Sequence, residues 1–154
     1  GGRTMELKNS QIRRIVLGEH QGLRKRLDEI EAGLKSLTPD HPEPLAQVRV
    51  LFRALLEAFV RHVEHEEALL KPILLDLQAW EPARLEKMEK EHREQRAQVA
   101  ALLELDPLVP VATWVAEIRD FSNRLRADMA EEEEDFLDPD VLRDDAIAVD
   151  PFSG

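Results

Sequence analysis

Residues 45–73 constrain the fold of this chain most, because their apolar side chains recur every three or four positions. This spacing places them on one face of an amphipathic helix. The apolar members are Leu45, Val48, Phe52, Leu55, Phe59, Leu69 and Ile73. His62 and Glu66 interrupt the face one turn apart. An imidazole and a carboxylate at positions i and i+4 of a buried face can converge on a metal ion.

Three further segments have the same helical period, and polar residues interrupt each of them. We expect helices over residues 10–37, 45–77, 82–106 and 113–136. Ser10 and Thr113 are the expected N-caps, and Pro72 is expected to kink the second helix. The interrupting residues are His20, His62 with Glu66, His92, and Asp128 with Glu132, in the order of the four helices.

Four amphipathic helices with short connections predict an all-α, antiparallel up-down four-helix bundle. We expect residues 8–140 to form this bundle and residues 141–154 to form a C-terminal tail. Residues 1–4 precede Met5 and look like a remnant of recombinant expression, so they are left out of the fold. His20 and His62 each lie about 17 residues from the loop that joins their helices, or roughly 26 Å along the helix axis. His92 and Asp128 match in the same way, so the polar residues should meet at one height.

The amino-acid composition excludes several kinds of site and binding partner. Without cysteine, thiolate metal sites and disulfides are excluded. The 32 acidic and 21 basic residues give a net charge of -11, which opposes binding to nucleic acid or to an anionic membrane. No apolar run approaches the roughly 20 residues of a membrane span, and no signal peptide is evident. These features predict a soluble, cytoplasmic protein.

Burial of six ionisable groups at one level requires cations. Uncompensated, they would cost more than the roughly 5 to 15 kcal/mol by which a domain is stable. Nitrogen and oxygen ligands suit iron or manganese, and carboxylates can bridge two ions. Water, oxo groups or a small ligand such as dioxygen or peroxide would complete the coordination. These residues specify no partner protein, and a homodimer is left open.

The order of these residues resembles the haemerythrin-like HHE cation-binding domains. The resemblance covers residues 10–140, and its most specific part is RHVEHEEALLKP at residues 61–72. It implies a four-helix bundle around two non-haem iron ions bridged by carboxylate and oxo groups. The matching ligands are His20, His62, Glu66, His92 and Glu132. Asp128 departs from the family, which usually has histidine there, and Arg96 stands where oxygen-carrying haemerythrins have a second histidine of the third helix.

Several alternatives stay open. A slip of one residue in the fourth helix would turn Met129 and Glu133 inward in place of Asp128 and Glu132. Gln95 is expected to pack or to bond a ligand, whereas His65 lies at the edge of the face. The chain is favoured as a protein that binds or senses oxygen, peroxide, nitric oxide or iron. The alternatives are a di-iron oxidase or peroxidase, and a structural bundle whose metal site has decayed.

Overall fold

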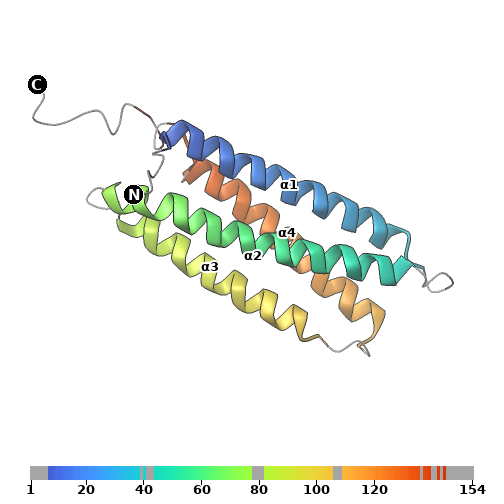
Figure 1. The fold of residues 1–154 in the computed structure, drawn as a ribbon. Helices are drawn as coiled ribbons and strands as arrows, with labels where there is room; N and C mark the ends of the chain where they lie inside the picture. Colours follow the sequence, from blue (N-terminus) through green and yellow to red (C-terminus); the bar gives the residue numbers. More distant parts are fainter. Residues whose placement is uncertain are drawn as a thin grey trace, which may run out of the picture.

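The computed structural model describes residues 7–38, 40, 44–77, 82–105, 109–135, 137–139, 142 and 144. They form α1 (Asn9–Lys35), α2 (Pro44–Leu77), α3 (Pro82–Leu103) and α4 (Val111–Asp135). Consecutive helices run in opposite directions and lie alongside one another (Figure 1). Both α1 and α3 pack against α2 and α4, which closes the bundle. The predicted all-α, antiparallel four-helix bundle is therefore confirmed.

Both predicted N-caps are wrong. Lys8 precedes α1, and Ser10 lies in the first turn. Its backbone N–H and its hydroxyl instead donate hydrogen bonds to the carboxylate of Asp144, at 2.9 and 2.8 Å. α4 begins at Val111, ahead of Thr113. At the start of α1 the side chain of Gln11 accepts a hydrogen bond of 2.8 Å from the backbone N–H of Lys8.

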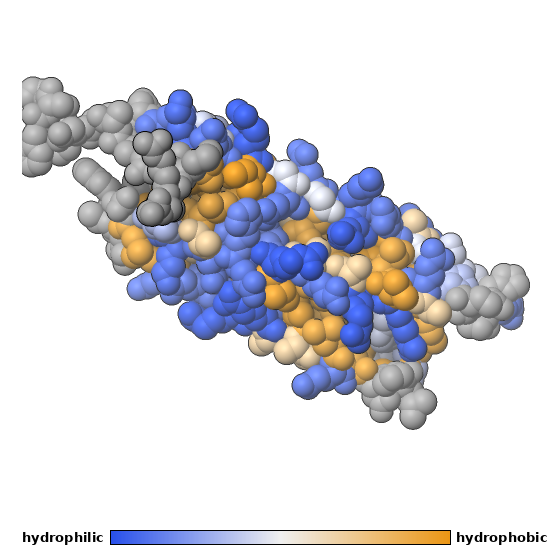
Figure 2. Space-filling view, viewed as in Figure 1, coloured by the Kyte–Doolittle hydropathy of each residue, from blue (hydrophilic) through white to orange (hydrophobic). Residues whose placement is uncertain are grey.

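The apolar core has two parts. The larger part lies toward the α1–α2 connection, where Phe52 and Phe59 each meet Phe121 edge to face. The smaller part lies at the other end of the bundle and includes Val16 and Met88. The polar residues of the predicted faces lie between the two parts. On the face that Figure 2 shows, hydrophilic residues cover much of the surface and apolar patches lie between them.

α2 runs through Pro72 as one helix. Past Glu66 its fully buried residues are Leu70 and Leu74, whereas the predicted Leu69 and Ile73 are only partly buried. The buried face therefore continues from Glu66 in steps of four residues, to Leu70 and then Leu74. The sequence prediction had taken a step of three from Glu66 and so placed Leu69 and Ile73 on this face.

Part of the predicted C-terminal tail packs on the bundle. Leu142 is buried in the smaller part of the core, and Asp144 bonds Ser10. Residues 1–4, His41 and Phe136 lie outside the described residues. Among the helices that the structure describes, none combines the length and the apolar character that a membrane span requires.

Candidate metal centre

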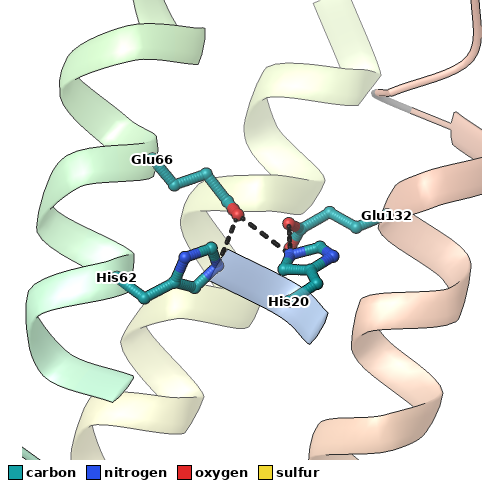
Figure 3. A group of neighbouring side chains, drawn as sticks. All are labelled: His20, His62, Glu66 and Glu132. Carbon is teal, nitrogen blue, oxygen red and sulfur yellow. Dashed lines mark ion pairs between the residues drawn. The ribbon is translucent and has the colours of Figure 1, made fainter. Parts of the chain in front are cut away.

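Three histidines and two glutamates meet between the two parts of the core. His20 comes from α1, His62 and Glu66 from α2, His92 from α3 and Glu132 from α4, and all five are buried. Figure 3 shows four of them pointing toward one another. They line a cavity of about 10 Å³, whose apolar walls include Phe59 and Leu125. This space holds little more than a single water-sized atom.

Glu66 lies at the middle of the cluster. Its Oε2 is 2.8 Å from Nε2 of His62 and 3.4 Å from Nε2 of His20 (Figure 3). Its Oε1 faces the opposite way and is 2.9 Å from Nε2 of His92. Glu132 is arranged similarly, with Oε1 3.2 Å from Nε2 of His20 and Oε2 3.9 Å from Nε2 of His92. Each carboxylate therefore spans from His20 to His92.

The outer nitrogen of each histidine meets a further carboxylate. Nδ1 of His20 is 2.8 Å from Glu133, Nδ1 of His62 is 2.7 Å from Glu19, and Nδ1 of His92 is 3.0 Å from Glu67. An ionised carboxylate can only accept, so each Nδ1–H donates. The Nε2 of a neutral imidazole then turns a lone pair toward the centre. Carboxylate partners of this kind orient metal-binding histidines in many proteins.

Each outer carboxylate also has a second partner. Glu133 pairs with Arg24 at 2.8 Å, and Glu67 pairs with Arg96 at 2.9 Å. Glu19 instead accepts a hydrogen bond from His65. These pairs hold the outer carboxylates in place.

Several atoms at the centre lack a hydrogen-bond partner. Nε2 of His20, Oε2 of Glu66 and Oε1 of Glu132 are buried and make no hydrogen bond to the described protein. These atoms lie close together but do not have hydrogen-bond geometry. A buried polar atom without a partner costs about 1 to 3 kcal/mol. A cation among these three atoms would satisfy all of them, so the donor set fits a metal ion.

The close approach of the buried carboxylates and imidazoles shifts their pKa values in the metal-free protein. Burial favours the neutral form of His20, but the neighbouring carboxylates of Glu132 and Glu66 raise its pKa to about 10. Burial and the charge of Glu66 raise the pKa of Glu132 well above its ordinary value. Burial acts in the same direction on Glu66, but its neighbours Glu132, His20, His62 and His92 lower its pKa well below the ordinary value. In the absence of metal, protons take up the negative charge of the cluster.

The structure places Asp128 at the edge of this cluster. Asp128 is half-buried, and its Oδ2 accepts a hydrogen bond of 2.7 Å from the Gln95 amide. Met129 is 2% exposed, and Glu133 bonds the outer side of His20. α4 therefore turns Glu132 and Met129 inward. This rotation lies between the two alternatives left open by the sequence, which were Asp128 with Glu132 and Met129 with Glu133.

Of the remaining sequence candidates, Gln95 is buried and lines the cavity, whereas His65 and Arg96 lie outside the cluster. His65 is 45% exposed and reaches the centre only through Glu19. Arg96 pairs with Glu67 on the outer side of His92. The contact of Gln95 with Asp128 is the hydrogen bond expected of a side chain beside the ligands.

Sequence reasoning missed the roles of the three outer carboxylates. Each is the chain neighbour of a residue in the cluster: Glu19 of His20, Glu67 of Glu66, and Glu133 of Glu132. An acidic residue beside an inward-facing one lies on the flank of its helix and can reach the next helix. That adjacency was the available signal.

The fold and the cluster define a class of protein, namely helical bundles with a buried metal-binding centre. The chain matches the family model described as Hemerythrin HHE cation binding domain over residues 11–138 and belongs to this family. A search of curated proteins and a search of solved structures each found no match. The predicted resemblance is confirmed, and the buried histidines and glutamates fit a cation-binding domain.

Proposed function

We propose that this protein holds two non-haem iron ions and uses them to bind or sense a small ligand such as dioxygen, peroxide or nitric oxide. The observation that carries this proposal is the orientation of Glu66, whose two oxygens face different histidines. Such a carboxylate can bridge two ions, as in other di-iron bundles. Manganese would suit the same nitrogen and oxygen donors.

The donors divide into two groups. His20 and His62, with Oε2 of Glu66 and Oε1 of Glu132, would hold one ion. His92, with Oε1 of Glu66 and Oε2 of Glu132, would hold the other. The second group has fewer protein donors, so we expect its ion to bind more weakly.

Iron in this position would supply redox chemistry toward dioxygen or peroxide. The chain's own residues orient the donors through the outer carboxylates and exclude water with apolar walls. A cavity of about 10 Å³ has no room for an organic substrate. This size favours binding or sensing of a small ligand over an oxidase that acts on organic molecules. A cytoplasmic location stays a prediction from the sequence.

Metal content tests the proposal. Protein purified without chelator and loaded anaerobically with Fe(II) should contain two iron ions per chain by elemental analysis. His62→Ala should lower the iron content to one ion per chain or none, because it removes a donor from the group that has more protein donors. Glu64→Ala is the matched control, since it truncates an exposed side chain two residues away on α2, and it should keep both ions.

Other outcomes identify the alternatives. No metal in the unaltered protein would support a structural bundle with a decayed site and would refute the proposal. A single ion would refute a dinuclear centre. Two ions with sustained turnover of peroxide, abolished in His62→Ala, would identify a peroxidase.

A further inference from the structure

A surface pocket lies between α1 and α2, outside the metal centre. Its volume is about 390 Å³, which is within the usual range for small-molecule sites. α1 supplies Glu19, Gly22, Leu23 and Arg26 to its walls, and α2 supplies Ala58, Arg61, His62 and His65. His62 also lines the buried cavity, so this imidazole separates the pocket from the centre.

The charges of the pocket favour an anion. Arg26 and Arg61 face it from opposite helices, and neither forms an ion pair with any residue that the structure describes. Both oxygens of Glu19 are already engaged, one by His62 and the other by His65. The two guanidinium groups are therefore available to an outside ligand. Guanidinium pairs well with a carboxylate because its planar donors match the two oxygens.

The base of the pocket is apolar. Leu23 and Ala58 are the apolar residues of its lining, and a side-chain carbon added to Gly22 would meet no atom within 4 Å. Gly22 is therefore not required by close helix packing, and its missing side chain leaves space in the pocket. Hydrophilic and hydrophobic residues are interspersed over the visible face of the bundle (Figure 2).

We propose that this pocket binds a small organic monocarboxylate. Arg26 and Arg61 hold the carboxylate, and the apolar part of the ligand rests on Gly22, Leu23 and Ala58. The bound molecule lies beside His62 and next to the Glu19 carboxylate that orients it. The pocket itself is formed without metal, so this inference does not depend on the proposed iron centre.

Calorimetric titration with benzoate tests the proposal, using iron-loaded protein whose metal content is measured in each sample. We expect saturable binding of one benzoate per chain. Benzamide, the neutral analogue, should bind more weakly by about tenfold or more. Arg26→Gln and Arg61→Gln should each weaken benzoate binding by about tenfold or more. Arg124→Gln removes the same charge from an exposed position on α4 and should leave the affinity unchanged.

A second pair of variants tests the space rather than the charge. Gly22→Leu fills the pocket and should abolish benzoate binding while helical content and metal content persist. Gly18→Leu is the matched control, because Gly18 lies one turn earlier on α1, has the same open surroundings and lines a different pocket with Arg13 and Arg14. Its benzoate affinity should equal that of the unaltered protein.

Three results would overturn the proposal. They are no saturable benzoate binding at millimolar concentration, equal binding of benzamide, and unchanged affinity in both arginine variants. Benzoate binding to protein that takes up no iron would support this pocket and refute the di-iron centre. Two iron ions without benzoate binding would do the reverse.

Discussion

At the residue scale, the two ring nitrogens of each buried histidine have different tasks. Nε2 faces the centre, and Nδ1 meets a carboxylate on the outer side. The carboxylates of Glu19, Glu67 and Glu133 would therefore control metal affinity without touching the metal. Burial favours the neutral form of Glu67, but Arg96 and His92 lower its pKa and keep it ionised.

Glu67→Gln tests this arrangement. The amide oxygen can still accept a hydrogen bond from His92, but the negative charge is lost. Metal affinity should fall by about tenfold, measured by competition with a chromophoric chelator. Glu64→Gln, which removes an exposed carboxylate from the same helix, is the control. An equal loss in both variants would assign the effect to overall charge rather than to His92.

The pH dependence of metal binding follows from His20. Its pKa in the metal-free protein is about 10, above the ordinary value of 6.5, so His20 carries a proton at neutral pH. Metal binding must release that proton. We therefore expect metal affinity to rise from pH 6 to pH 8 in the same chelator competition. An affinity independent of pH would contradict the protonation of His20 in the metal-free centre.

The same shift acts in the opposite sense on the metal-free fold. A group whose pKa is raised by folding stabilises the protein fully below its unfolded pKa. This contribution of His20 is present below pH 6.5 and is lost as the pH rises toward about 10. Chemical denaturation of the metal-free protein across this interval should show the decline.

At the element scale, the outer carboxylates connect neighbouring helices in a regular order. α4 reaches α1 through Glu133, α1 reaches α2 through Glu19, and α2 reaches α3 through Glu67. The fourth connection, from α3 to α4, would join Glu91 to position 128. Because position 128 is an aspartate, carboxylates of Glu91, Asp128 and Glu131 lie within 4.8 Å of one another. Burial and these neighbours raise the pKa of Glu91 to about 7.

Asp128→His should complete the fourth connection. The new imidazole can donate to Glu91 and offer its other nitrogen to the ion beside His92. Binding of the second ion should strengthen by roughly tenfold, measured as iron ions per chain at limiting iron. Asp120→His adds an imidazole to an exposed position two turns earlier on α4 and is the control. Equal stoichiometry in the two variants would contradict the expected connection.

At the scale of the whole molecule, the metal centre lies between two apolar cores and draws donors from all four helices. Without metal, unpartnered atoms of α1, α2 and α4 face one another in the interior. A bound cation would therefore hold the helices together, so stability and metal occupancy should be coupled.

Metal removal tests this coupling. At free metal about 1,000-fold above its dissociation constant, binding stabilises the folded state by about 4 kcal/mol. For a chain of this size, chelation should then lower Tm by roughly 10 °C, as followed by circular dichroism at the helical band. His62→Ala should respond much less to the chelator. An unchanged Tm on chelation of the unaltered protein would refute a structural contribution of the metal.

The spacing of residues within each helix was enough to predict the four-helix bundle and most of the buried polar residues that meet at one height. His20, His62, Glu66, His92 and Glu132 are all buried where their helical faces placed them. The period of a helix determines which residues share a face, and helix length determines their height. Both properties belong to one segment at a time, so they can be read without the partner helices.

Tertiary structure decided the properties that depend on two segments at once. The rotation of α4 places Met129 inward and Asp128 at the edge, where Asp128 accepts a hydrogen bond from Gln95 on α3. Asp144 lies 134 positions from Ser10, so no local pattern could reveal that contact. The pairing of Glu19 with His62 likewise required α1 and α2 to pack. A helical face follows from backbone geometry, whereas contacts across faces depend on how whole helices rotate and pack together.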